Sequence, residues 1–344
     1  MIFLDGYEVR SAIESAILAC DSSDDDDLEL PSFTSQKFWH RMVNPRFIPV
    51  NLFHYENINY ATIHEAAAAR KDDFEQVNYM ALDVYVRKDL SSDSPKPVLL
   101  FVHGGGWTGG DKGLPYPIIF HLAEAGWIVV STNYRLAPSS IYPNQLIDVK
   151  RAIRWVKENI HAFKGDPGFI AIAGDGAGGH LAAMAALTPN TLEYQPHFEK
   201  VDTSVNAVIL INAHTDLLHL MDIGKTKNKI TSYFDVSNHF SKVISGHAEI
   251  NEEFLRKHSP VNLITKESVP FLVFHGDRDQ YIPFESSKKF VEKLQQISKS
   301  ETRFIQIPGG HHVYHLFSSP RSHYQAIGVE RWLNHIYHQQ LKEK

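Results

Sequence analysis

Two short stretches of this 344-residue chain place carboxylates and histidines where acid–base chemistry could use them. The stretch "HGDRDQYIP" contains Asp277 and Asp279, and the stretch "PGGHHVYH" contains His311 and His312. A carboxylate that accepts a hydrogen bond from one imidazole nitrogen orients the ring, so the other nitrogen can act as a general base. Both stretches follow apolar runs, so each is expected at the end of a strand.

A third stretch is a glycine-rich loop that could stabilise negative charge. In "FVHGGGW", His103 ends an apolar run and Gly104, Gly105 and Gly106 follow it. Glycine lets the main chain approach a ligand closely, and backbone N–H groups in such loops can form an oxyanion hole. Taken alone, the loop fits an ordinary turn equally well.

The fourth stretch, "FIAIAGDGAGGHLAA", has the spacing of a nucleophile turn but no nucleophile. The pattern is Gly, any residue, Ser, any residue, Gly between a strand and a helix. Residues 174–178 fill these five places, and the central one is Gly176. Glycine has no hydroxyl to attack a substrate. It does tolerate the strained backbone of such a turn, so the fold is expected to persist without the chemistry.

The elements that must position these four stretches alternate between strands and helices. Strand-like apolar runs lie at 81–86, 97–103, 127–134, 169–174, 207–213, 270–276 and 302–308. Helical patterns lie at 144–163, 180–187, 285–297 and 324–341. Continuous apolar runs suit strands that are buried on both faces of a mostly parallel sheet. We therefore predict an α/β fold with helices on both faces of this sheet, and all four stretches at the carboxyl ends of its strands.

The alternation also predicts how the chain is divided. Residues 76–344 should form the main α/β domain, and residues 1–75 an N-terminal extension or cap segment with a short helix and an acidic linker. The stretch at about 214–253 breaks the alternation and is predicted to be a lid insertion. The role of the N-terminal extension stays open.

Composition excludes several classes of protein. The net charge is −6 and no basic block occurs, which argues against nucleic-acid binding. Cys20 is the only cysteine, so no internal disulfide can form. No signal peptide or transmembrane run is seen, which favours a cytoplasmic protein with no membrane span. The 20 histidines show no metal-ligand spacing, so no metal and no cofactor are expected. The oligomeric state stays open.

Taken together, the motifs resemble the α/β-hydrolase fold, and within it the hormone-sensitive-lipase-like carboxylesterases of the HGGGW type. The matching blocks are "HGGGW", "YRLAP", "GDGAGGHLAA", "HGDRDQYIP" and "PGGHHVYH". They extend over roughly residues 80–340. The resemblance implies short-chain acyl esters as the usual substrates, with the lid and the cap setting the specificity.

The resemblance also implies roles for individual residues. Asp279 resembles the family's catalytic acid and His312 its catalytic base, whereas Asp277 holds the turn and His311 stands at a variable position. The backbone N–H groups of three residues correspond to the oxyanion hole: Gly105, Gly106 and Ala177. The nucleophile position, where the family has serine, is Gly176.

The missing serine leaves several functions open. The chain is predicted to be a carboxylesterase-family hydrolase for small acyl esters that is inactive or very weak as given. It would then be a natural pseudoenzyme or a serine-to-glycine inactivated variant. One alternative is a non-catalytic protein that binds a small apolar ester or acid. Another is a weak hydrolase in which His312 activates a water molecule.

Overall fold

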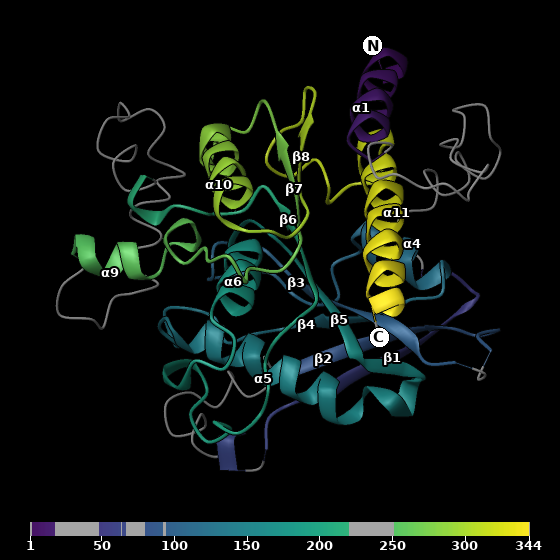
Figure 1. The fold of residues 1–344 in the computed structure, drawn as a ribbon. Helices are drawn as coiled ribbons and strands as arrows, with labels where there is room; N and C mark the ends of the chain where they lie inside the picture. The colour runs from purple at the N-terminus through teal and green to yellow at the C-terminus, as the bar shows by residue number, and fades with distance from the viewer. Residues whose placement is uncertain are drawn as a thin grey trace.

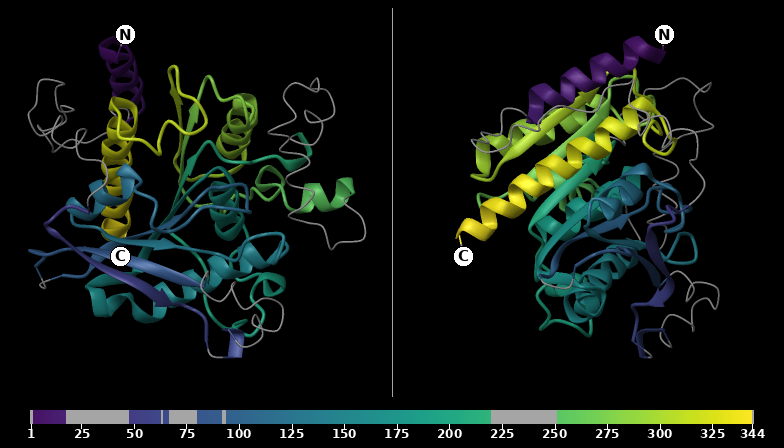
Figure 2. Two further views of the ribbon diagram at one scale, coloured as in Figure 1. Left: turned by 180° about the vertical axis from the view of Figure 1, so that it is seen from behind. Right: turned by 90° about the vertical axis from the view of Figure 1, so that its right-hand side faces the viewer.

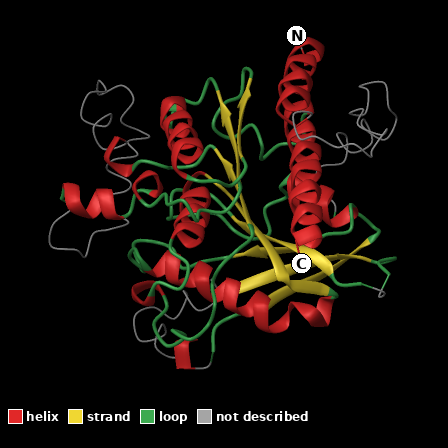
Figure 3. Cartoon of the chain, viewed as in Figure 1, coloured by secondary structure: helices red, strands yellow, loops and turns green. Residues whose placement is uncertain are grey.

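The chain forms one eight-stranded sheet, with strand order β1-β2-β4-β3-β5-β6-β7-β8 (Figures 1 and 3). The structure is a computed structural model and describes residues 2–17, 48–62, 64–66, 80–91, 94–219 and 251–343. The strands are β1 (Leu52–Asn59), β2 (Ala81–Arg87), β3 (Lys96–Val102), β4 (Ile128–Thr132), β5 (Gly165–Asp175), β6 (Ala207–Ile211), β7 (Phe271–Gly276) and β8 (Thr302–Ile307).

The sheet is mostly parallel, as predicted. Among the described strands, the β1–β2 and β2–β4 pairs are antiparallel. The other pairs run parallel: β3–β4, β3–β5, β5–β6, β6–β7 and β7–β8. All seven predicted strands form. Strands β4, β6 and β7 are buried along their whole length, because helices cover both of their faces.

Two layers of helix sandwich the sheet, which confirms the predicted architecture (Figure 2). One hydrophobic core contains side chains of α5 (Asn144–Asn159), α6 (Gly176–Leu187) and α10 (Phe284–Ile297). The opposite core contains side chains of α1 (Ile2–Ile17), α4 (Pro117–Glu124) and α11 (Pro320–Glu343). The remaining described helices are α9 (Glu252–Lys257) and the short 3₁₀ turns η2 (Ile160–Phe163), η3 (Leu192–Tyr194) and η5 (Pro260–Asn262).

Residues 1–75, predicted as an extension, contribute to both the sheet and its cover. β1 pairs with β2 and forms one edge of the sheet. Helix α1 lies beside α11 and buries Val9 and Ile13 in the same core as α11 (Figure 2). Of the predicted lid, residues 220–250 lie outside the described residues. Among the described helices, none is long and apolar enough to cross a membrane.

Candidate active site

The nucleophile turn joins the end of β5 to the start of α6. Gly176 is the first residue of α6 and has a φ of +50°, in the left-handed region that favours glycine. A β-carbon at Gly178 would lie only 2.2 Å from the carbonyl oxygen of Val102, so the helix packs directly on the end of β3. The sharp strand–turn–helix geometry expected from the sequence is present.

Asp279 and His312 form the expected pair beyond the ends of β7 and β8. Nδ1 of His312 lies 2.8 Å from Oδ2 of Asp279. The other carboxylate oxygen of Asp279 accepts hydrogen bonds from the backbone N–H groups of Tyr281 at 2.8 Å and Ile282 at 2.9 Å. Three partners therefore fix the carboxylate, and the carboxylate orients the imidazole so that Nε2 is available as a base.

His275 is a further partner of Asp279 that sequence reasoning missed. Its Nε2 lies 3.3 Å from Oδ2 of Asp279, and its Nδ1 lies 2.7 Å from the hydroxyl of Ser287. Burial alone would raise the pKa of Asp279, but hydrogen bonds from His275 and His312 hold this pKa well below its ordinary value. Asp279 is thus ionised. His275 and Asp279 lie in the same short stretch at the end of β7, "HGDRD", and this was the only sequence signal for His275.

The pair faces the vacant nucleophile position. A β-carbon placed at Gly176 would lie 3.6 Å from Nε2 and 3.8 Å from Cε1 of His312, which is ordinary van der Waals contact. A hydroxyl on that carbon would fall within hydrogen-bond reach of the base. Gly176, His312 and Asp279 therefore lie in a row, with His312 between the other two.

The glycine-rich loop after β3 lies against the nucleophile turn. The backbone N–H of Gly104 donates to Oδ1 of Asp175, the residue before Gly176, at 2.7 Å. Gly105 and Gly106 have φ values of +113° and +63°, and a β-carbon at Gly105 would lie 2.3 Å from a carbonyl oxygen. The loop thus requires glycine for its conformation, and its hydrogen bond to Asp175 ties it to the nucleophile turn.

The carboxylate of Asp175 joins this loop to the histidine loop. Its Oδ2 accepts a hydrogen bond from Nε2 of His315 at 3.0 Å, and both side chains are buried. Burial would raise the pKa of Asp175, but the hydrogen bond from His315 and the nearby His103 lower it below its ordinary value. Asp175 therefore packs under the turn as an ionised anchor. His315 was missed because nothing in the spacing of "HHVYH" predicts its partner.

Buried rings surround Trp107, the residue that follows the three glycines. The indole of Trp107 stacks on His214 with ring centroids 5.0 Å apart, and its edge meets His180 at 5.4 Å. The pKa of His214 lies well below its ordinary value; burial is the main cause, and the nearby His312 is the second. The neutral imidazole of His214 adds no positive charge beside the base.

The neighbouring candidates Asp277 and His311 are not part of the pair. Asp277 accepts the backbone N–H of Gly309 at 2.8 Å and so ties the loop after β7 to the loop after β8. His311 is exposed. In the part of the chain that the structure describes, no group of three or more His, Cys, Asp or Glu side chains could hold a metal ion.

This fold is that of the α/β-hydrolase carboxylesterases, and comparison with known proteins agrees. The BD-FAE family model matches residues 82–294, so the chain belongs to this family. It is 38% identical over 257 residues to the probable carboxylic ester hydrolase LipM of Mycobacterium tuberculosis. It is 36% identical over 277 residues to the esterase LipC of the same organism. These matches cover 74% and 80% of the chain, but only 58% and 66% of the relatives' own length.

Solved structures share the fold. A truncated carbohydrate esterase from gut microbiota superimposes with a TM-score of 0.66 at 23% identity, covering 83% of this chain and 96% of that one. Esterase B from Lactobacillus rhamnosis, inhibited by a C6-C4 SN3 compound, gives a TM-score of 0.67 at 18% identity, covering 90% of this chain and 95% of that one. At these identities the likeness supports the fold alone.

Proposed function

We propose that this chain is a small-acyl-ester hydrolase of the carboxylesterase family from which only the nucleophile is missing. The observation that carries this proposal is the 3.6 Å separation between a β-carbon at Gly176 and Nε2 of His312, beside an Asp279–His312 contact of 2.8 Å. The similarity to LipM, a probable carboxylic ester hydrolase, and to LipC, an esterase, supports an ester as the substrate.

The chemistry would follow from the proposed roles if residue 176 were serine. The hydroxyl oxygen would attack the ester carbonyl while its proton passes to Nε2 of His312, and ionised Asp279 would stabilise the resulting imidazolium. The N–H groups of Gly105, Gly106 and Ala177 would hold the oxyanion. The imidazolium would then protonate the leaving alcohol, and water would release the acid from the acyl-enzyme.

With glycine at position 176, the chain cannot carry out the first of these steps. No attacking oxygen is attached at position 176, so hydrolysis requires a water molecule activated by His312 and an intact oxyanion hole. Serine proteases that lose a triad member retain roughly 10³–10⁴-fold catalysis over water. We propose that the chain hydrolyses esters at such a residual level, or binds them without turnover.

The direct test is Gly176→Ser, assayed with p-nitrophenyl esters of acids of increasing chain length. We expect the hydrolysis rate to rise by several orders of magnitude over the chain as given, because the members of such a site act as a unit. Gly176→Ala is the matched control, since it adds the β-carbon without the hydroxyl, and it should stay at the starting rate. His312→Ala added to Gly176→Ser should abolish the gain.

A negative result would have a defined meaning. If Gly176→Ser folds, as judged by circular dichroism, and yet stays at the rate of Gly176→Ala for every chain length, the esterase proposal fails.

The second candidate is a receptor for a small apolar ester or acid, and the retained Asp279–His312 pair and glycine loop favour it. The chain keeps Asp279, His312 and the anchored glycine loop although none of them can complete the reaction without residue 176. Calorimetric titration of the unaltered chain with butyrate and ethyl butyrate tests this function. Saturable binding that His312→Ala weakens would support it, and the absence of any heat would eliminate it.

A further inference from the structure

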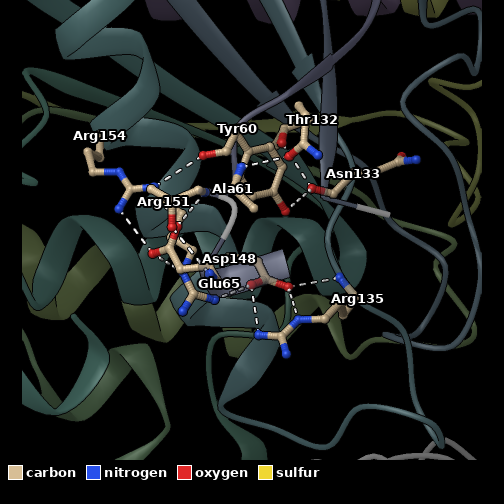
Figure 4. A network of polar contacts seen from close by, with 11 residues as sticks. Tyr60, Ala61, Glu65, Thr132, Asn133, Arg135, Asp148, Arg151 and Arg154 are labelled. Atoms are coloured by element: carbon tan, nitrogen blue, oxygen red, sulfur yellow. Dashed lines mark hydrogen bonds and ion pairs between the residues drawn. The ribbon is translucent and has the colours of Figure 1, made fainter. Parts of the chain in front are cut away.

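A cluster of buried charges lies away from the candidate active site, around α5. Three arginines surround two carboxylates there, Glu65 and Asp148 (Figure 4). Nε and Nη2 of Arg135 contact Asp148 at 2.7 and 2.9 Å. Arg151 bridges both carboxylates, with Nη1 at 2.9 Å from Asp148 and Nε at 2.9 Å from Glu65. Arg154 holds Glu65 at 2.9 and 3.0 Å.

The two carboxylates have little capacity for further donors. Glu65 accepts three bonds from the two arginines and a fourth from the backbone N–H of Thr62 at 2.8 Å. Asp148 also accepts the backbone N–H of Arg135 at 3.1 Å, and its side chain is fully buried. Both negative charges are therefore occupied within the cluster.

The guanidinium groups keep unused donors. Arg151 Nη2 and Arg154 Nε have no hydrogen-bond partner among the described residues, although both arginines are only 6% exposed. Among the described residues, the cluster brings together three guanidinium groups and two carboxylates. An ion-pair cluster that is only structural does not need the spare donors of Arg151 and Arg154.

A cavity adjoins this cluster. It has a volume of about 700 Å³ and is lined by all three arginines, with Asn144, Ile147 and Pro196 among the other residues. Ligand pockets for small molecules fall between about 300 and 1,000 Å³. The lining thus combines the charged side chains of the cluster with the apolar side chains of Ile147 and Pro196.

We propose that this cavity binds a small organic anion. Its carboxylate or phosphate oxygens would accept hydrogen bonds from Arg151 and Arg154, because the planar guanidinium fork matches both headgroups. Its apolar body would pack on Ile147 and Pro196. The cavity shares no residue with the Asp279–His312 pair, so the proposal is independent of the esterase function.

The test is calorimetric titration of the full chain with inorganic phosphate, acetate and hexanoate. We expect saturable binding, with hexanoate at least about tenfold tighter than acetate because its methylene groups leave water. If phosphate binds more tightly than hexanoate, the natural headgroup is a phosphate; the reverse order indicates a carboxylate. Either order agrees with the site.

Two variants locate the binding. Asn144→Phe fills the cavity without touching the ion pairs, since the Asn144 side chain makes no hydrogen bond among the described residues, and it should abolish binding. Arg151→Lys keeps the charge but loses the fork and should weaken binding by about tenfold. Arg303→Gln, which changes an arginine on β8, is the matched control and should bind normally.

The proposal is overturned if none of the three anions binds, or if binding persists unchanged in Asn144→Phe. If Arg151→Lys does not fold, Asn144→Phe alone decides the question.

Discussion

At the scale of single residues, the proposed nucleophile position also has an unusual backbone conformation. The φ of +50° at Gly176 is one that residues with a β-carbon rarely adopt, but the space around it is open, since the nearest atom to an added β-carbon is Nε2 of His312 at 3.6 Å. The cost of a side chain there is therefore conformational and not steric.

This distinction predicts the stability of variants in the turn. Gly176→Ala and Gly176→Ser should each lower the free energy of unfolding by about 1–2 kcal/mol, the usual cost of a left-handed residue with a β-carbon. Gly178→Ala should cost far more, because its β-carbon would lie 2.2 Å from a carbonyl oxygen. Urea denaturation of the three variants checks the order, and a Gly176→Ser variant more stable than the unaltered chain would contradict it.

The sequence predicted individual site residues only where they belong to a motif. The position of the motifs after strands indicated two aspartates and two histidines. The resemblance to the carboxylesterases selected Asp279 and His312 among them, and the contact between these two is present. His275 and His315 were not predicted, because their role depends on which carboxylate a buried ring meets in space. Periodicity and spacing along a chain carry no such information.

At the scale of elements, three loops from separate strands meet at one buried carboxylate. Asp175 at the end of β5 binds the loop after β3 through Gly104 and the loop after β8 through His315. The glycine loop is therefore held in place by side-chain contacts that do not involve residue 176.

Replacing His315 should displace the glycine loop, because Asp175, which holds this loop, would lose a hydrogen-bond partner. In the Gly176→Ser background, we expect His315→Ala to lower kcat by about tenfold or more with little change in KM, because small displacements of transition-state donors are costly. His315→Gln keeps a donor and should recover most of the rate. Steady-state kinetics measure the split, and equal kinetics for all three proteins would show that His315 does not position the loop.

Elements were predictable in proportion to the length and continuity of their apolar runs. Strands β4, β6 and β7 are the clearest cases, because the helices on both of their faces make their sequences continuously apolar. β1 was missed: it is an edge strand with several exposed residues, and its pairing with β2 is not visible in its own sequence. Its segment was therefore assigned to an extension.

At the scale of the whole molecule, the charge cluster of Figure 4 links the N-terminal segment to the main domain. Glu65 belongs to residues 1–75, whereas Arg151 and Arg154 belong to α5. Burial would raise the pKa of Glu65, but hydrogen bonds from Arg154 and Thr62 and the charge of Arg151 lower it from 4.5 to about 2.

The lowered pKa predicts an acid-sensitive contribution to stability. Because the folded-state pKa lies below the unfolded-state pKa, ionised Glu65 stabilises the fold fully above about pH 5, and this stabilisation is lost as the pH falls toward 2. Glu65→Gln should lower the free energy of unfolding at pH 7 by about 3–5 kcal/mol, since it leaves buried arginines unpaired. It should also flatten the pH dependence between 5 and 2.

Denaturation of both proteins across this range checks the prediction. Equal slopes with pH in Glu65→Gln and the unaltered chain would show that Glu65 does not contribute.

The left-handed backbone at Gly176 makes the loss and the recovery of a nucleophile unequal in evolution. A change from serine to glycine there relaxes the chain, so it is favoured by selection for a folded protein whenever hydrolysis is not under selection. The reverse change needs a single nucleotide, because some serine and glycine codons differ at one base, but it lowers stability. A protein whose stability lies well above the threshold for folding can therefore recover the hydroxyl in one step. A marginally stable protein first needs a stabilising mutation elsewhere.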